Sequence, residues 1–343
     1  MAPSAPGGLT VAVTGPTGEI GKPFVAALER ARDVSRILGM ARRPFDPAAH
    51  GWKKTEYRRG DVLDRAAVEA LVEDADVVVQ LAFIIIAGAE SRHINVEGSR
   101  NVFEAAVQSG ARRIVYASSV AAYGFPREVD GLITEDVPAL GHERHPYSAH
   151  KAEVEEVLDD ALQGGDAGAY VFRPCIVAGP QAPLLVNQIP YVRLSGRVPA
   201  AVRSLFDQVP ALRPVMPDPG VPFQLVHHDD VASALKAGVL GRGEPGAYNL
   251  AGPGEVTMRD LGDELGYYTI PIPDLALDAT AEVVARLPFV PDEATWIEAV
   301  RRPVLMDTSK ARRLLRWRPR YDARETLRQT VAAARADLGA AQE

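Results

Sequence analysis

The chain has 343 residues, of which 47% are hydrophobic and 24% are charged, as in folded soluble proteins with one large core or one core plus a smaller lobe. The formal net charge of -7 argues against non-specific nucleic-acid binding, which requires a basic face. The single cysteine, Cys175, excludes an intrachain disulfide framework and favours a reducing compartment, so we expect a cytoplasmic location.

Neither of two segments near the N-terminus predicts membrane targeting. Residues 1–8 have no basic region and no apolar core, so we expect a disordered tail rather than a signal peptide. Residues 77–89 form the most hydrophobic stretch, but a bilayer span needs about 20 residues. We therefore expect a buried strand that runs into a loop, and no membrane partner.

Strand and helix patterns alternate through the first half of the chain. Apolar runs predict strands at 9–13, 36–41, 77–83, 112–117 and 169–173. Amphipathic spacing predicts helices at 19–32, 64–73, 92–109 and 147–162. This alternation predicts an α/β fold with a Rossmann-type doubly wound parallel sheet, whose ligands bind at the carboxyl ends of the strands.

The second half is less regular. Residues 179–224 and about 253–303 are rich in proline, whereas 231–240 has a helical pattern, 247–250 a strand pattern and 322–337 a helical pattern. We expect a dinucleotide-binding domain at 9–178 plus about 225–252. The remainder, about 179–224 plus 253–343, would form a smaller C-terminal substrate lobe built from insertions.

A glycine-rich turn follows the first predicted strand. Gly15 would permit a tight turn, Gly18 would let a pyrophosphate approach, and Gly21 would let the helix pack on the strand. Free N–H groups of this turn and of the helix start would bind phosphate oxygens. The predicted cofactor-binding residues here are Gly15, Thr17, Gly18, Glu19, Ile20 and Gly21.

The turn after the second predicted strand bears on the choice of dinucleotide. It holds Arg42 and Arg43 and has no acidic residue for the 2′-hydroxyl of NAD. The planar guanidinium of arginine suits a 2′-phosphate, so NADP is favoured, with NAD as the alternative.

Three polar residues farther along predict proton transfer. Tyr147 and Lys151 lie four residues apart and therefore share a helix face. A nearby ammonium favours the phenolate, so Tyr147 can exchange a proton with a carbonyl or alcohol oxygen. Ser119, at the end of the strand at 112–117, would donate a hydrogen bond to the same oxygen.

With these residues in place, the chain resembles the extended short-chain dehydrogenase/reductases, the group that includes the NAD-dependent epimerase/dehydratase proteins. The resemblance covers about 9–335, and its matching segments are 14–21, 60–64, 79–82, 95–102, 118–124, 147–151, 173–174 and 226–232.

The resemblance implies roles by position. Asp61 and Val62 would flank the adenine, and Leu81 and Ala82 would line the ribose and pyrophosphate site. Lys151 would also hold the nicotinamide ribose. Arg173 and Pro174 would lead the chain from the nicotinamide into the substrate lobe, whereas Asn95 would support the sheet and helix.

Three functions remain open for a small-molecule substrate. The first is a reductase or dehydrogenase of a carbonyl/alcohol pair, the second is an epimerase of the UDP-glucose 4-epimerase kind with retained NAD, and the third is a non-catalytic NADP-sensing protein. Val120 and Ala121 stand where sugar dehydratases of the family carry an acidic pair, which disfavours dehydration. Ile176 stands where members acting on nucleotide sugars often have asparagine.

Apolar residues of the predicted lobe suit an apolar or aromatic carbonyl substrate, although each can equally belong to a core. They are Val186, Ile189, Tyr191, Leu205, Phe206, Tyr267, Tyr268 and Trp296.

Two further expectations concern metals and assembly. His227 and His228 are neighbours whose side chains should point apart, so no metal site is expected there. Relatives often dimerise through two helices, which would here be 92–109 and 147–162, so the resemblance implies a homodimer.

Overall fold

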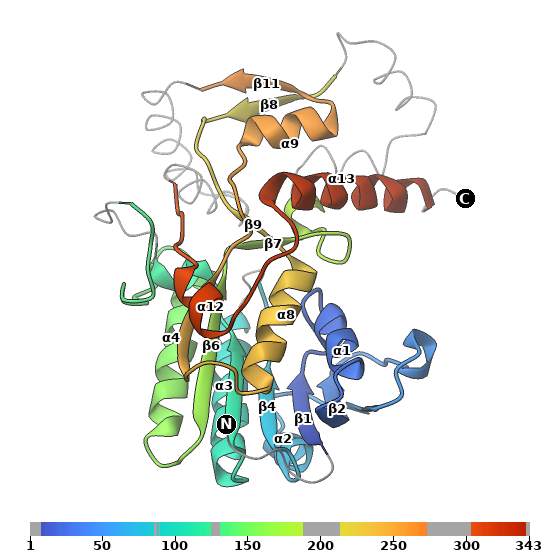
Figure 1. Cartoon of the computed structure of the whole chain (residues 1–343), viewed down its shortest axis with the longest axis vertical. Coiled ribbons are helices and arrows are strands. Elements are labelled where there is room, and N and C mark those ends of the chain that lie inside the picture. Colours follow the sequence, from blue (N-terminus) through green and yellow to red (C-terminus); the bar gives the residue numbers. More distant parts are fainter. Residues whose placement is uncertain are drawn as a thin grey trace. The chain divides into compact units, whose positions relative to one another are not determined.

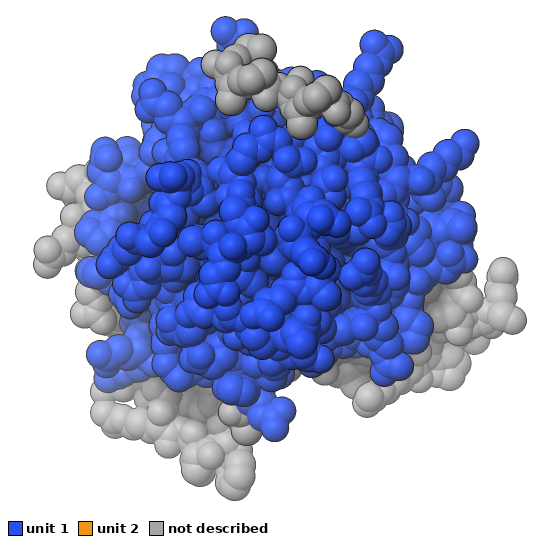
Figure 2. Space-filling model, turned by 90° about the horizontal axis from the view of Figure 1, so that it is seen from below, with its two compact units in different colours: residues 1–175, 229–250, 306–318 blue, residues 176–228, 251–305, 319–343 orange. Residues whose placement is uncertain are grey.

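The computed structural model describes residues 8–85, 88, 90–124, 131–187, 213–272 and 303–340. The chain divides into two compact units. The first comprises residues 1–175, 229–250 and 306–318, and the second comprises 176–228, 251–305 and 319–343. Figure 2 shows one face of the first unit. Residues 1–7 of the predicted tail lie outside the described residues.

The first unit is built on a seven-stranded parallel sheet (Figure 1). Its strands are β1 (Leu9–Thr14), β2 (Val34–Ala41), β3 (Thr55–Arg59), β4 (Val77–Gln80), β5 (Arg113–Ala117), β6 (Gly168–Pro174) and β10 (Gly246–Leu250). They lie in the order β10-β6-β5-β4-β1-β2-β3, which confirms the predicted Rossmann-type doubly wound fold. The order reverses between β1 and β4, so a ligand crevice is expected at the carboxyl ends of these two strands.

Helices cover both faces of this sheet. One face carries α2 (Arg65–Val72), α3 (Ser91–Gln108) and α4 (Pro146–Leu162), and the other carries α1 (Gly21–Glu29) and α8 (His228–Val239) (Figure 1). Phe103, Ile114 and Leu158 are completely buried in the core under α2, α3 and α4. Burying each such side chain stabilises the fold by about 1.5–3 kcal/mol.

The edge strand β3 is not predicted by the apolar pattern. It reads Thr-Glu-Tyr-Arg-Arg, and its side chains are exposed or half-buried. Edge strands are commonly charged because only one side of the ladder is paired. Arg36 and Glu56 form an exposed ion pair between β2 and β3, with Nε and Oε1 2.6 Å apart.

The short helix α12 (Ser309–Leu314) also belongs to the first unit, where it packs near β10. Just beyond it, the Trp317 indole Nε1 donates to the Asp230 carbonyl at 3.0 Å. This hydrogen bond joins a segment late in the chain to α8.

The second unit has small paired strands and helices of its own. Its elements are β7 (Ile176–Ala178), α5 (Leu184–Asn187), β8 (Val215–Asp218), β9 (Leu225–His227), α9 (Met258–Leu265), β11 (Tyr268–Pro271) and α13 (Ala323–Ala340). Strand β7 pairs with β9, and β8 pairs with β11, in both cases parallel. Each of these strands is only three or four residues long, and β8 and β11 contain proline, so the hydrophobic pattern does not indicate them.

Two of the residues expected to favour an apolar substrate contribute to the core of the second unit. Val186 is completely buried there, and Tyr267 packs against the same cluster, whereas Tyr268 is 46% exposed. The others lie outside the described residues, namely Ile189, Tyr191, Leu205, Phe206 and Trp296. Among the helices that the structure describes, none is both long and apolar enough to cross a membrane.

Candidate functional site

The glycine turn joins β1 to α1, and a different physical reason favours glycine at each of its three glycine positions. Gly15 has φ +69°, and a Cβ there would lie 2.8 Å from the Ala82 amide nitrogen. A Cβ on Gly21 would lie 2.2 Å from the Gly15 carbonyl oxygen. Gly18 is exposed, and a Cβ there would lie 3.6 Å from the nearest atom, the Gly15 carbonyl oxygen. Packing therefore requires Gly15 and Gly21, while Gly18 keeps the approach to the turn open for a ligand.

The start of α1 fits an anion. Ile20 occupies the N-cap position and provides no side-chain hydrogen bond to the first turn. Uncapped N–H groups at a helix start attract phosphate oxygens. Thr17 and Glu19 are half-buried beside Gly18, and burial raises the pKa of the Glu19 carboxyl.

A second segment, after β4, is bonded to this turn. The Thr14 hydroxyl is fully buried, donates to Gln80, and accepts from the Leu81 and Ala82 amides at 3.2 and 3.3 Å. The Gln80 amide nitrogen donates to the Ala82 carbonyl at 3.0 Å. Leu81 and Ala82 are thus held against the glycine turn, at the point where the strand order reverses.

The residues after β3 form a short supporting turn. Asp61 accepts a hydrogen bond from the Leu63 amide at 3.1 Å, and the Val62 side chain is buried against Gly98 of α3. The Asn101 side chain donates to the Val62 carbonyl at 3.0 Å. The turn is therefore anchored to α3, with Asp61 half-buried.

The arginine turn after β2 is fixed through its backbone. Tyr57 of β3 donates to the Ala41 and Arg43 carbonyls, and Arg59 donates to the Arg42 carbonyl at 3.0 Å. The side chains of Arg42 and Arg43 are exposed and make no ion pair within the described part of the chain. Their guanidinium groups are available to an anionic ligand.

Ser119 and Tyr147 meet beyond the carboxyl end of β5. Ser119 caps the 3₁₀ turn η2 (Val120–Tyr123) by accepting from the Ala121 amide at 3.2 Å. Helix α4 begins at Pro146 and is capped by the His145 imidazole, so Tyr147 lies in its first turn. Burial raises the pKa of the Tyr147 phenol, and its hydrogen bond with Ser119 opposes that rise.

Lys151 lies one helical turn farther along α4 and is 3% exposed. Its ammonium donates to the Ala117 carbonyl at 2.7 Å and to the Tyr116 hydroxyl at 3.4 Å. Burial lowers the pKa of Lys151 to about 7, and the negative charge of Glu155 opposes that shift. The structure thus brings together Ser119, Tyr147 and Lys151, as the sequence predicts.

Arg173 has a buried partner. Its guanidinium forms two hydrogen bonds with the Glu155 carboxylate, through Nε at 3.0 Å and Nη2 at 2.5 Å, and it lies 4.6 Å from the centroid of the Tyr123 ring. The Ser118 hydroxyl donates to the same carboxylate at 2.5 Å. Burial alone would lower the pKa of Arg173, but the hydrogen bonds with Glu155 raise it. The Arg173 side chain is committed to this pair, and Pro174 beside it is buried.

Two residues at the site, Glu155 and Phe83, are not among those predicted from the sequence. Glu155 follows Lys151 by four residues, which is a helical-face signal that could have indicated it. Phe83 lies with its ring 3.7 Å from the Lys151 ammonium, measured to the ring centroid. It lies inside an apolar run that continues through Ile84 and Ile85, so it gives no sequence signal of its own.

The expectation that His227 and His228 point apart is wrong. Their ring centroids lie 4.2 Å apart, and the His227 ring stacks on Tyr321 at 3.9 Å. Strand β9 ends at His227 and helix α8 begins at His228, so the alternation of side chains along a strand does not apply to this pair.

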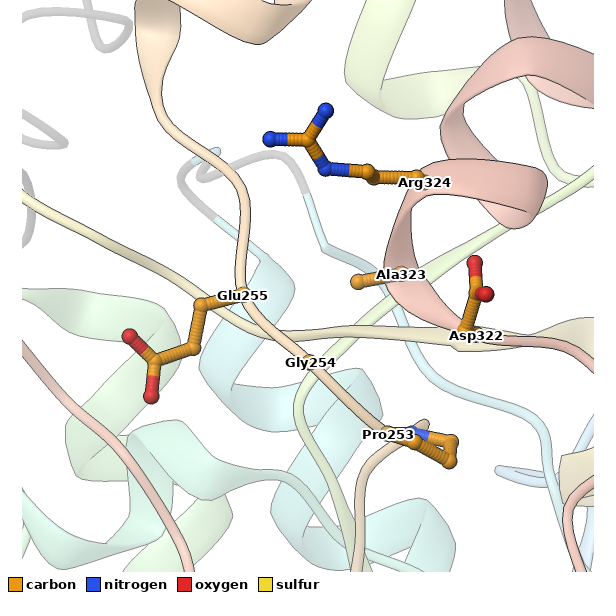
Figure 3. Close-up of a pocket in the computed structure, with 6 residues that line it drawn as sticks. All are labelled: Pro253, Gly254, Glu255, Asp322, Ala323 and Arg324. Carbon is orange, nitrogen blue, oxygen red and sulfur yellow. The ribbon is translucent and has the colours of Figure 1, made fainter.

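The second unit also contains a pocket of about 260 Å³ at the start of α13. Figure 3 shows that the Glu255 carboxylate points away from the other labelled side chains. Arg324 pairs with Asp260 at 3.1 Å, and the Asp322 carboxylate caps the Glu325 amide at 2.7 Å. Its lining residues are Pro253, Gly254, Glu255, Asp322, Ala323 and Arg324.

Residues 11–251 match the family described as the NAD dependent epimerase/dehydratase family. The chain belongs to this family. The glycine turn, the β4 segment and the Ser119–Tyr147–Lys151 group all lie within the matched range. Because Gly18 leaves the start of α1 open, the residues present fit the dinucleotide that the family name implies.

Curated proteins of differing kinds are similar to this chain. An uncharacterized protein from Mycobacterium tuberculosis is 26% identical over 333 residues, which is 96% of this chain and 31% of that protein. The chain thus spans about a third of that relative's length. Human 3 beta-hydroxysteroid dehydrogenase type 7 is 32% identical over 164 residues, or 45% of this chain and 44% of that enzyme.

Solved structures share the fold over nearly the whole chain. UDP-glucuronic acid 4-epimerase from Bacillus cereus, in complex with NAD, has a TM-score of 0.69 and 18% identity, covering 96% of this chain and 99% of that chain. At this level of identity the likeness establishes the fold alone.

Proposed function

We propose that this protein is an NAD(P)-dependent oxidoreductase that transfers hydride between a nicotinamide dinucleotide and a carbonyl or alcohol substrate. The observation that carries the proposal is the meeting of Ser119, Tyr147 and Lys151 at the end of β5. The dinucleotide, when bound, supplies or accepts the hydride. A protein that only sensed the dinucleotide would have no need of this group.

Tyr147 is the proposed acid/base. Because burial raises the pKa of its phenol, Tyr147 keeps its proton at neutral pH and can donate it to a carbonyl oxygen. The Ser119 hydroxyl can donate to the same oxygen and holds the substrate in line. The Lys151 ammonium, one helical turn away, then stabilises the phenolate left behind. In alcohol oxidation the step runs in reverse, and the Tyr147 phenolate, stabilised by the Lys151 ammonium, accepts the proton from the alcohol.

NADP is the proposed dinucleotide, with Arg42 as the 2′-phosphate partner and Arg43 beside it. Both side chains are exposed on a turn held by Tyr57 and Arg59. NAD remains the competing candidate, because the structurally similar epimerase is a complex with NAD.

Replacing Arg42 by Ala tests that choice. We expect the variant to bind NADPH about tenfold or more weakly and to bind NADH as the unmodified protein does, because only NADPH loses a charge-assisted hydrogen bond. Fluorescence titration of both reduced dinucleotides measures this. The control is Arg30→Ala, at the exposed end of α1, which should alter neither affinity. Equal weakening of both dinucleotides by Arg42→Ala would contradict the NADP proposal.

The proposed substrate class is an apolar alcohol or ketone. The human relative named above acts, by its name, on a 3 beta-hydroxysteroid, and Ile176 supports an apolar rather than a nucleotide-sugar substrate. Ser119 is followed by Val120 and Ala121, so no carboxylate is present there for the removal of water. A panel containing a 3-ketosteroid, an aromatic ketone and UDP-glucose separates the candidates. Oxidation of the reduced dinucleotide by a ketone supports the proposal, whereas conversion of UDP-glucose with tightly held NAD would favour an epimerase.

A further inference from the structure

Three aromatic rings surround the ammonium of Lys151. The Nζ atom lies 3.7 Å from the centroid of the Phe83 ring, 4.9 Å from that of Tyr116 and 5.8 Å from that of Tyr147. A cation within about 6 Å of an aromatic ring face is attracted by the electrons of that face. We refer to these three rings as the Lys151 cage. Phe83 is its nearest ring and the only one of the three without a hydroxyl.

The backbone on both sides of Phe83 is fixed by buried side chains. Asn95 of α3 accepts from the Ile84 amide at 2.7 Å and donates to the Ile84 carbonyl at 2.9 Å. On the other side, Gln80 donates to the Ala82 carbonyl at 3.0 Å. Asn95 is completely buried, so these bonds are shielded from water. The backbone that carries Phe83 is therefore fixed by its own segment and by Asn95, independently of Lys151.

Phe83 also contacts the proposed acid/base. Its ring meets that of Tyr147 edge to face, with the centroids 5.6 Å apart and an interplanar angle of 86°. One side chain, from the segment after β4, thus touches two functional residues of α4. We propose that Phe83 is a positioning residue, whose ring holds the Lys151 ammonium and the Tyr147 ring in the positions that proton transfer requires. This rests on the proposed function, in which those two residues move and stabilise the proton.

The need for such a ring follows from the charges around Lys151. Burial disfavours the ammonium, and the carboxylate that supports it, Glu155 on the same helix, is itself paired with Arg173 of β6. Among the residues that the structure describes, the other titratable groups facing it are the phenols of Tyr116 on β5 and Tyr147 on α4. Phe83 attracts the cation without titrating, so it favours the charged form across the working pH range.

Titration of Lys151 tests the proposal without a substrate. The chain has only six lysines, so protein labelled with ¹³C-lysine gives few signals, and the Lys151→Arg variant assigns the one of interest. We expect Phe83→Leu to lower the midpoint of Lys151 by about one pH unit, because the attraction of one ring face is lost. Phe83→Tyr keeps a ring and should leave the midpoint close to that of the unmodified protein. Phe83→Met provides the same measurement if the leucine variant does not fold.

Lys310 is an internal control, since its Nζ lies 5.1 Å from the Tyr248 ring and it should titrate alike in every variant. An unchanged Lys151 midpoint in Phe83→Leu, or an equal fall in Phe83→Tyr, would overturn the proposal. Because the titration needs no turnover, this outcome is distinct from failure of the proposed oxidoreductase activity.

Discussion

At the residue scale, the buried pair of Glu155 and Arg173 explains how α4 is attached to the sheet near the site. Glu155 is 8% exposed and Arg173 is 6% exposed, and Ser118, next to Ser119, bonds to the same carboxylate. A buried pair contributes modest net stability, but removing one member leaves an uncompensated charge. The pair thus makes the placement of Ser118 and Lys151 depend on Glu155.

Replacing Glu155 by Gln should therefore destabilise the protein strongly. We expect a loss of about 3 kcal/mol in the free energy of unfolding, because the Arg173 guanidinium stays buried without its counter-charge. Urea denaturation measures the loss. Glu56→Gln is the matched control, since its pair with Arg36 is exposed and its removal should cost less than about 1 kcal/mol. Similar losses in both variants would contradict the assigned role of Glu155.

At the scale of elements, the glycines of the turn have two separate roles, one in folding and one in ligand binding. Gly15 has a positive φ and is crowded by the β4 segment, whereas Gly18 is exposed and uncrowded. A side chain at Gly15 strains the backbone, but one at Gly18 projects into the space that we assign to the pyrophosphate.

We expect Gly15→Ala to lower the free energy of unfolding by about 1–3 kcal/mol. Gly18→Ala should fold with nearly unchanged stability and bind the dinucleotide about tenfold or more weakly, because its methyl group occupies ligand space. Thermal unfolding and dinucleotide titration measure the two effects. Full dinucleotide affinity in Gly18→Ala would place the pyrophosphate elsewhere.

The main elements could be predicted because their patterns are strong. Most strands of the sheet are buried apolar runs, and α3 and α4 follow helical spacing close to the predicted bounds. Strand β3 could not be predicted in this way, since an edge strand with Glu56, Arg58 and Arg59 lacks a buried face. The short strands of the second unit form through pairings between distant segments, such as β7 with β9, that no local pattern encodes.

The residues of the candidate site fall into the same two groups, those that the sequence indicates and those that only the fold reveals. Gly15, Tyr147 and Lys151 belong to short motifs, and the sequence alone indicates them. Phe83 and the Glu155–Arg173 pair depend on three-dimensional contacts between separate elements. Their residue types are those of an ordinary core or helix surface, so only the fold reveals what they touch.

At the scale of the whole molecule, family membership and the parallel sheet are established, and the reaction is the proposal that remains to be tested. The candidate site lies within the first unit, to which residues 229–250 and 306–318 also belong. That unit holds the glycine turn, the arginine turn, the Lys151 cage and the proposed acid/base. The substrate class, an apolar alcohol or ketone, is a proposal that rests on the human relative and on Ile176.

The measurement that tests the central claim most directly compares the unmodified protein with Tyr147→Phe. Both are titrated with reduced dinucleotide and then assayed for its oxidation with the ketone panel. We predict that the variant binds the dinucleotide as tightly as the unmodified protein and turns over ketones about 10²–10⁴-fold more slowly, because it lacks the proton donor. Retained turnover in Tyr147→Phe would contradict the proposed role of this phenol and, with it, the proposed reaction.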